Sequence, residues 1–493
     1  MKTTTQIFSP LLSAVALMLG LGLSLPSHAS EKMDLPSFRE LLKERDVKPL
    51  DPKPEYSEAK LKLGQALFFD PLLGGNQDVS CATCHHPLTA SADGRSRAVG
   101  TLAYVDKGRR LPVGFSLVEV NENKDMVLTG FNMSGAAHPF TPRNSPEIFN
   151  RGDSAWTTMF WDSRAHQKDD GGFAVNQMRL SKSPGLYQAE MPPIIENILA
   201  AQAMMPVLSA DEMRGAKGQT GATGSHNEVG QINGRHEEEI WAVLMKRLLA
   251  IDGYRELFSA TYPEIPLEEL HFAHAANAIA AFEIDAFTLL DSPWDRFLAG
   301  DDAALDEAQL AGAQLFYGKA QCYECHSGKL MTDQETHNIG VIPIGPGPDL
   351  NEDADYGVAH RSNAGLDQKY EFRTPPLRNV ELTGPYMHNG AYRTVEAAIR
   401  HHLDPVEHLE NFDKSQLEPE FRGAVHDEEK IIKDVKKTLS DKVPSPALTE
   451  EEIAQLVEFH KALTAPSARD LRHLIPESVP SGLEMVAPIP ETD

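Results

Sequence analysis

All four cysteines of the chain lie in two copies of one short motif, Cys-x-x-Cys-His, at residues 81–85 and 322–326. In this motif, two thiols can form thioether bonds to the vinyl groups of one porphyrin, and the histidine that follows can bind its iron. Zinc held by two Cys-x-x-Cys pairs is the alternative, but zinc does not require a histidine directly after each second cysteine. The sequence therefore predicts two covalently bound c-type haems. Their attachment residues are Cys81, Cys84 and His85 for one haem, and Cys322, Cys325 and His326 for the other.

Similar segments precede the two motifs and indicate a duplicated unit. Residues 63–69 read LGQALFF and residues 311–317 read AGAQLFY, each compatible with an amphipathic helix. Two unrelated helices are the alternative. Apolar residues three and four positions apart favour further helices, and convincing strand patterns are few. The sequence predicts a mainly α fold with two cytochrome c-like haem domains. The further helical segments are 237–250, 267–290 and 450–463.

The N-terminal residues resemble a secretory signal. Lys2 precedes an apolar stretch at 11–25, and small residues at 27–29 fit a cleavage site. We expect residues 1–29 to be removed and the mature protein to be periplasmic, where c-type haem is attached. No later stretch approaches 18 uninterrupted apolar residues, so no membrane span is expected.

Length and charge limit the function further. The 493 residues, of which 41% are hydrophobic, suit two or more domains. The net charge of −26 argues against nucleic acid and anionic membranes as partners, and fits association with a small redox protein. We predict domains at 30–296 and 297–465, followed by a proline-rich, acidic tail at 466–493.

A series of further motifs follows along the chain: 141–146 (TPRNSP), 160–164 (FWDSR), 200–207 (AAQAMMPV), 212–213 (EM), 295–301 (DRFLAGD), 372–379 (FRTPPLRN) and 385–390 (PYMHNG). With these motifs in this order, from about residue 61 to 465, the chain resembles bacterial di-haem cytochrome c peroxidases and the wider superfamily that they share with MauG, the methylamine-dehydrogenase maturation enzyme. Extra sequence near 166–199 and 214–235 interrupts the resemblance.

The resemblance implies a division of labour between two haems that flank a shared interface. His85 would be the proximal ligand of a peroxidatic haem in the N-terminal domain. His326 would hold the C-terminal haem, which receives electrons. Trp161 matches a tryptophan between the haems, where an aromatic ring offers an electron a route; an ordinary core tryptophan is the alternative.

The resemblance also implies a distal acid–base group. Glu212 matches the family glutamate, with Gln202 in register beside it. Cleavage of a peroxide requires a group that takes one proton and returns it to the leaving oxygen, and a carboxylate can do both. A solvated acid beside a glycine-rich loop is the alternative for Glu212.

The sixth ligands depart from the family pattern. The peroxidases place a methionine, and MauG-type enzymes a tyrosine, where this chain has His402, with His401 and Met387 as alternatives. Imidazole in place of thioether should lower the potential of that haem, since methionine raises it. At the peroxidatic haem, His138 is the nearest candidate for a removable distal ligand.

The resemblance finally implies a calcium ion between the haems, held by an asparagine side chain and backbone carbonyls. Asn144, Thr374 and Pro376 match those positions, and oxygen ligands of this kind suit Ca²⁺.

Three functions follow as hypotheses. The first is a periplasmic di-haem peroxidase that reduces hydrogen peroxide to water with electrons from a small cytochrome or copper protein, and such peroxidases are often homodimers. The second is a MauG-like enzyme that oxidises a partner protein through high-valent iron. The third, a plain electron-transfer cytochrome, would need no distal acid.

Overall fold

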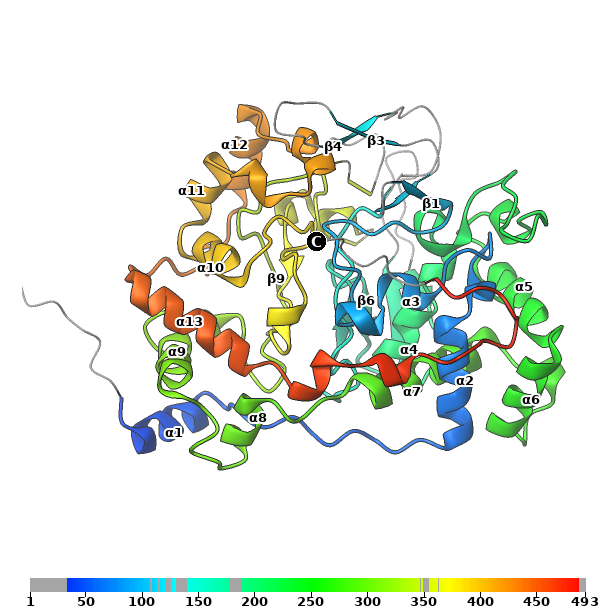
Figure 1. Cartoon of the computed structure of the whole chain (residues 1–493), viewed down its shortest axis with the longest axis horizontal. Helices are drawn as coiled ribbons and strands as arrows, with labels where there is room; N and C mark the ends of the chain where they lie inside the picture. The colour runs from blue at the N-terminus through cyan, green and yellow to red at the C-terminus, as the bar shows by residue number, and fades with distance from the viewer. Residues whose placement is uncertain are drawn as a thin grey trace, which may run out of the picture.

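Two helical lobes lie side by side in the computed structural model (Figure 1). The first lobe holds α2 (Glu58–Phe69), α3 (Cys81–Cys84), α4 (Ile198–Ala203), α5 (Glu237–Leu249), α6 (Asp252–Thr261) and α7 (Phe272–Phe287). The second holds α8 (Pro293–Leu298), α9 (Glu307–Tyr317), α10 (Val395–Leu403), α11 (Pro405–Glu410), α12 (Glu429–Lys437) and α13 (Glu450–Ala462). The predicted mainly α fold is confirmed. The structure describes residues 33–106, 109–112, 116–119, 126–129, 140–176, 188–345, 347–348, 354–361 and 363–486.

Each lobe is built on one closely packed helix pair. In the first, a Cβ placed on Gly64 of α2 would lie 1.9 Å from the backbone oxygen of Ala278 in α7. In the second, a Cβ on Gly312 of α9 would lie 1.9 Å from the backbone oxygen of Gln455 in α13. Only glycine permits so close an approach of two helices. The predicted repeat of residues 63–69 and 311–317 thus recurs as the same packing in both lobes.

Helix α8 packs with the second lobe, and the domain boundary predicted between residues 296 and 297 falls inside this helix. Trp294 and Phe297 of this helix are buried in the core of the second lobe, where Trp294 stacks on Phe297 with ring centres 5.5 Å apart.

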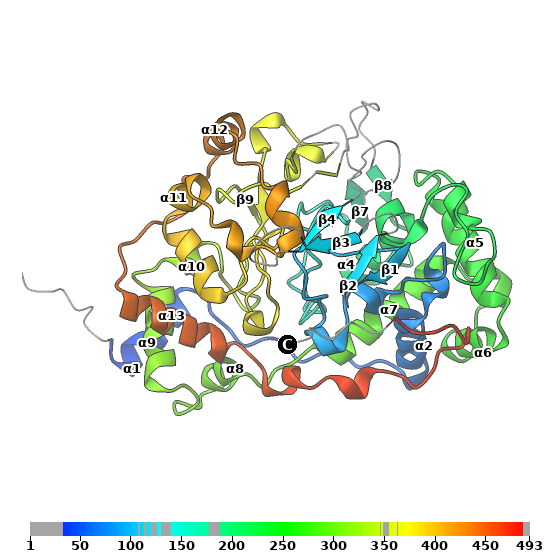
Figure 2. The same cartoon turned by 45° about the horizontal axis from the view of Figure 1, so that its top comes forward.

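The two ends of the described chain each cross to the other lobe (Figure 2). Helix α1 (Leu35–Glu44) packs on the second lobe, with the Phe38 ring 6.1 Å from that of Phe297. After α13, the chain runs across the first lobe, where Leu471 and Val479 are buried. The hydroxyl of Ser481 there donates to Asp70 (2.7 Å). The segment predicted as a tail is therefore packed against the first lobe up to at least this point.

An antiparallel sheet begins before the first predicted insertion and continues into it. Its order is β5 (Thr158–Met159), β6 (Ala165–Gln167), β7 (Phe173–Asn176) and β8 (Gln188–Glu190), and it packs on α4. The remaining strands form two-stranded pairs: β1 (Ala103–Asp106) with β2 (Arg109–Pro112), β3 (Ser116–Glu119) with β4 (Met126–Thr129), and β9 (Thr336–His337) with β10 (Phe372–Arg373). None of the described helices is long and apolar enough to cross a membrane.

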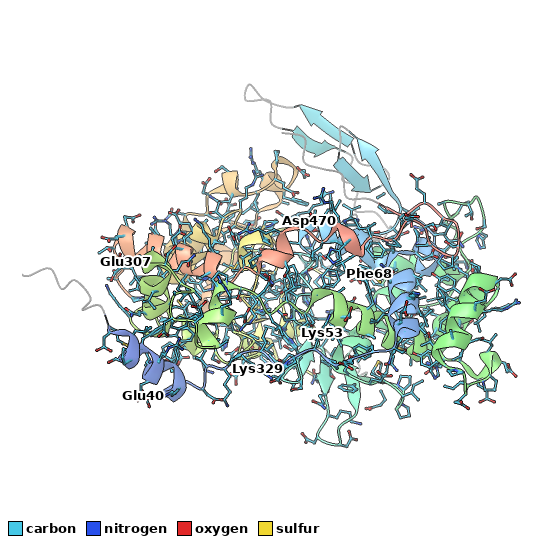
Figure 3. All side chains as sticks on the ribbon, turned by 60° about the horizontal axis from the view of Figure 1, so that its bottom comes forward. Glu40, Lys53, Phe68, Glu307, Lys329 and Asp470 are labelled. Atoms are coloured by element: carbon cyan, nitrogen blue, oxygen red, sulfur yellow. The ribbon has the colours of Figure 1, made fainter. Side chains whose placement is uncertain are left out.

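Ion pairs connect the lobes near their boundary. Lys329 of the second lobe, which is labelled in Figure 3, lies 2.8 Å from the carboxylate of Asp153 and 2.5 Å from that of Asp51. Because the Asp153 side chain is only 4% exposed, its pair with Lys329 is largely shielded from solvent.

Candidate functional site

The first Cys-x-x-Cys-His motif lines a cavity of about 340 Å³ in the first lobe. Its two cysteines lie in the short helix α3, which begins where the backbone N–H of Ser80 donates to the hydroxyl of Thr83 (2.9 Å). His85 follows directly, and its Nδ1 lies 3.2 Å from the carbonyl of Ser91. A histidine that donates one ring N–H to a carbonyl presents its other nitrogen as a metal ligand. Burial lowers the pKa of His85 to about 4, so the imidazole is neutral, as a ligand must be.

Glu212 and Gln202 line the same cavity from other elements. Gln202 lies on α4, and Glu212 lies in a π-helical turn, Ala210–Arg214, that follows Ser209. The backbone holds this turn closely: the carbonyl of Glu212 accepts from the N–H of Thr101 (2.9 Å). A Cβ on Gly100 would lie 2.0 Å from the oxygen of Asp211, so only glycine fits there. The backbone of the turn that carries Glu212 is therefore held by main-chain contacts.

The second predicted insertion supports this turn. The amide of Asn227, which is buried, donates to the carbonyl of Arg214 (3.0 Å) and to the side chain of Asn76 (2.9 Å). The backbone N–H of Gly75 donates to the carbonyl of Met213 (2.7 Å). Residues 214–235 thus pack against the segment that carries Glu212.

Two effects of the surroundings shift the pKa of Glu212 in opposite directions. Burial raises the pKa of its carboxyl group, while the guanidinium groups of Arg164 and Arg143 lower it. Arg164 lines the cavity, pairs with Asp162 (3.1 Å) and lies over the Phe160 ring (3.7 Å). A carboxyl group with a raised pKa can both accept and donate a proton closer to neutral pH than an exposed one.

The second motif lines another cavity, of about 200 Å³, in the second lobe. Nδ1 of His326 lies 3.2 Å from the carbonyl of Met331, the same support that His85 has. His402 of α10 lies across from it, with its own Nδ1 2.8 Å from the carbonyl of Ala398.

The His326 and His402 rings are spaced as two ligands of one ion would be. Their centres are 6.2 Å apart. Bonds of about 2 Å from one metal ion to two opposed imidazole nitrogens separate the ring centres by about 6 Å. His401 is not available for this role, because its ring nitrogens contact the hydroxyl of Tyr392 (2.9 Å) and the carbonyl of Ile339 (2.8 Å). Met387 lines the same cavity.

Trp161 lies in a wall that both cavities share, and its indole N–H donates to the carbonyl of Asn144 (2.9 Å). Two buried arginines in this wall, Arg151 and Arg373, bear on whether haem fits the cavities. The Nη1 atom of each has no hydrogen-bond partner among the described residues. A porphyrin brings two propionate carboxylates, which are the partners that unpaired guanidinium nitrogens require. The cysteine pairs, the neutral histidines and these arginines therefore fit haem in both cavities.

The candidate calcium residues line the two cavities. Asn144 lines both cavities, and Thr374 and Pro376 line the second. The Asn144 amide donates to the carbonyl of Arg95 (2.7 Å), and the carbonyl of Thr374 accepts from the hydroxyl of Thr332 (2.6 Å). Calcium binding stays a prediction. His138, the candidate distal ligand, lies outside the described residues.

Several cavity residues were not predicted from sequence. Arg143, Arg164 and Arg373 stand inside the matching motifs, so their charge was a visible signal. His460 of α13 lines the second cavity with Nδ1 2.7 Å from the carbonyl of Leu456, and only the tertiary structure brings it there. Asn176 reaches the first cavity from β7 of the inserted sheet.

Comparison with known proteins agrees with this geometry. Residues 58–303 match the family model of the di-haem cytochrome c peroxidases. MauG of Methylorubrum extorquens, a methylamine utilization protein, is 29% identical over 347 residues, which cover 70% of this chain and 68% of MauG. The cytochrome c551 peroxidase of Pseudomonas aeruginosa is 27% identical over 343 residues, which cover 70% and 71%. Among solved structures, a MauG-like protein associated with microbial copper homeostasis is 25% identical with a TM-score of 0.53, covering 86% of this chain and 95% of that protein.

The chain belongs to the di-haem cytochrome c peroxidase family, a family of oxidoreductases. Membership implies c-type haem, in agreement with the two motifs. Peroxidases and MauG proteins occur among the relatives at similar identity, so family membership alone does not choose between their two roles.

Proposed function

We propose that this protein is a periplasmic di-haem peroxidase, which reduces hydrogen peroxide to two waters with two electrons from a small redox protein. One observation carries the proposal: Glu212 and Gln202 line the same cavity as Cys81, Cys84 and His85. A chain that only transfers electrons has no use for an acid–base group there.

The chain's own residues handle the protons. When bound, the haems supply the electrons and the position where peroxide binds. The carboxylate of Glu212 takes a proton from one peroxide oxygen and returns it to the oxygen that leaves as water. The Gln202 amide orients the peroxide by hydrogen bonding. Two electrons and two protons in total convert one peroxide into two waters.

Trp161 connects the two cavities in this proposal. Its indole lines both, and the hydrogen bond to Asn144 fixes the ring in the shared wall. Electrons from the donor would enter at the haem of the second cavity and cross this wall. The net charge of −26 favours a donor with a basic docking face.

Replacing the acid–base group tests the proposal. We expect Glu212→Gln to lower steady-state peroxide turnover with reduced cytochrome c by roughly 100- to 10,000-fold, the usual effect of removing such a group. The variant should retain two haems per chain. Glu239→Gln, at an exposed carboxylate of α5, is the matched control and should leave turnover unchanged. Full turnover by Glu212→Gln would refute the proposed role.

The second candidate is a MauG-like oxidation of a partner protein. It is favoured by His402, because an imidazole opposite His326 lowers the potential of that haem relative to methionine and disfavours electron uptake from ordinary donors. Peroxide consumption that is slow with reduced cytochrome c but oxidises a partner protein would support this candidate instead.

A further inference from the structure

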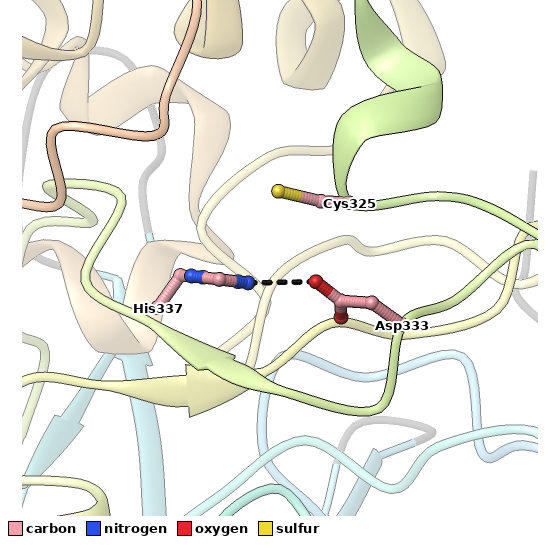
Figure 4. Close-up of side chains that lie close together, drawn as sticks. All are labelled: Cys325, Asp333 and His337. Atoms are coloured by element: carbon pink, nitrogen blue, oxygen red, sulfur yellow. Dashed lines mark hydrogen bonds and ion pairs between the residues drawn. The ribbon is translucent and has the colours of Figure 1, made fainter.

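A buried ion pair lies beside the second cysteine of the second motif (Figure 4). Nε2 of His337 lies 2.9 Å from Oδ2 of Asp333, and the sulfur of Cys325 is within 4.8 Å of both groups. Within the part of the chain that the structure describes, no other three such side chains converge in this way. These residue types would suit a metal ion, but the Cys325 sulfur is assigned to the haem thioether, so the trio does not form a metal site.

The surrounding structure fixes the pair in place. His337 lies on β9, where it pairs with Phe372 of β10, and its side chain is 7% exposed. Asp333 accepts hydrogen bonds from the N–H of Glu335 (3.0 Å) and from the side chain of Thr374. Its own N–H donates to the carbonyl of Cys325 (2.7 Å). The ion pair is thus attached to the motif through main-chain and side-chain contacts.

The Asp333 carboxylate favours a positive charge on His337. Its hydrogen bond to the imidazole is the largest cause that raises the pKa of His337 above the ordinary value. The imidazole lines the second cavity and lies within 4.8 Å of the Cys325 sulfur. The protonated imidazole is therefore a cation next to the point of haem attachment.

With Asp333 in place, a positive charge at residue 337 favours the reduced state of a nearby porphyrin more than a neutral side chain there would, because the added electron is attracted to that charge. The cluster occurs at the second cavity, where the two-histidine arrangement acts in the opposite direction by lowering the potential. His337 would therefore restore part of the electron affinity that the second haem loses when His402 is its sixth ligand.

We propose that His337, held by Asp333, is a positioning residue that raises the reduction potential of the haem in the second cavity through its charge beside the Cys325 thioether. This inference rests on the proposed function, which makes that haem the one that receives electrons. His337 takes no part in binding peroxide or iron.

The test is a redox titration of the full-length protein with both haems attached, followed by the absorption of the second haem. We expect His337→Gln to lower the equilibrium constant for reducing this haem about tenfold, which is a shift of about 59 mV for one electron. His337→Lys, which keeps a positive charge, should stay near the wild-type potential. His236→Gln is the matched control, because His236 pairs with Glu239 (3.5 Å) on the exposed surface of the first lobe. An unchanged or higher potential in His337→Gln, or equal potentials in the Gln and Lys variants, would overturn the proposal.

Haem content and axial ligation separate this charge effect from a structural one. Each variant should contain two haems per chain and keep the low-spin spectrum of the second haem. His337→Asn provides a second neutral variant if His337→Gln loses a haem. Loss of the second haem in both neutral variants but not in His337→Lys would assign the pair to haem attachment and refute potential tuning. If the wild-type protein does not turn over peroxide but the variants show the expected potentials, the proposed function is refuted and this inference is not. If the wild-type protein turns over peroxide but the potential of the second haem is the same in His337→Gln as in the wild type, this inference is refuted and the proposed function is not.

Discussion

In the proposed function the carboxyl group of Glu212 transfers protons, and its surroundings act on its pKa. Its turn is fixed by main-chain contacts with Thr101 and Gly100, and its side chain is removed from solvent. Burial favours the protonated form of the group, while Arg164 and Arg143 favour the ionised form. The balance between these effects decides the pH at which the carboxylate can accept a proton from peroxide.

Removing one arginine should move that pH. Glu212 must be ionised to take the first proton, so kcat/KM for peroxide should fall on the acid side as pH drops through its raised pKa. Arg164→Gln removes a cation that lowers this pKa, so the acid limb should move to higher pH. Asp162 keeps its ion pair with Arg143 (2.8 Å), which preserves the local fold.

The pH profile of kcat/KM for Arg164→Gln is the measurement, with Arg255→Gln as the control at an exposed arginine of α6. An acid limb that stays in place or moves to lower pH would show that Arg164 does not influence the essential carboxyl group.

At the scale of elements, one helix crossing is used twice. Gly64 on α2 and Gly312 on α9 occupy equivalent positions before the two motifs. A Cβ placed on either glycine would lie 1.9 Å from a backbone oxygen of the facing helix. These crossings bring α7 and α13 against the helices that precede the cysteines. Both helices contribute a polar residue to a cavity, Glu283 from α7 and His460 from α13.

Gly312→Ala should therefore destabilise the second lobe. The methyl group would overlap the Gln455 carbonyl, and such overpacking typically costs about 1–3 kcal/mol. Thermal unfolding followed by circular dichroism should show a lower Tm for this variant. Gly423→Ala is the control, since a Cβ there meets no atom within 4 Å. Equal Tm values for the two variants would contradict the assigned role of Gly312.

The sequence predicts these helices well, because helix formation depends on a local pattern. The haem attachment residues also rest on a local motif, and they stay a prediction. It does not predict the sheet of β5 to β8, whose strands of two to four residues are too short for a periodicity to show. It also does not predict the cluster of His337 and Asp333, because residues of these types have no local pattern that reveals which loop they will face. Trp161 and Glu212 were found through motif resemblance, and only the structure shows them lining the expected cavities.

At the scale of the whole molecule, the lobes are held together so that their cavities share one wall. Helix α1, which precedes the first lobe in sequence, packs on the second lobe. The segment after α13, which follows the second lobe in sequence, packs on the first. Both ends of the described chain therefore connect the two lobes. The Lys329 pairs with Asp51 and Asp153 add a third connection. A fixed wall keeps Trp161 in contact with both cavities, and the proposed electron transfer between the haems would require such a constant geometry.

The balance of potential across that wall is what distinguishes the two candidate functions, and His402 is the residue through which it can be changed. His402→Met would give the second haem the ligand pair that the peroxidases have. Because methionine raises the potential relative to histidine, we expect a higher midpoint potential for this haem and faster steady-state oxidation of reduced cytochrome c by peroxide. His408→Met is the matched control. Nδ1 of His408 also lies near the carbonyl oxygen four residues earlier (3.0 Å), but His408 lines neither cavity.

A raised potential without faster donor oxidation would favour the MauG-like role, since electron entry would then not be the limiting step. An unchanged potential with an unchanged low-spin spectrum would mean that His402 does not bind this iron, and the assignment of His326 and His402 as its two axial ligands would be refuted.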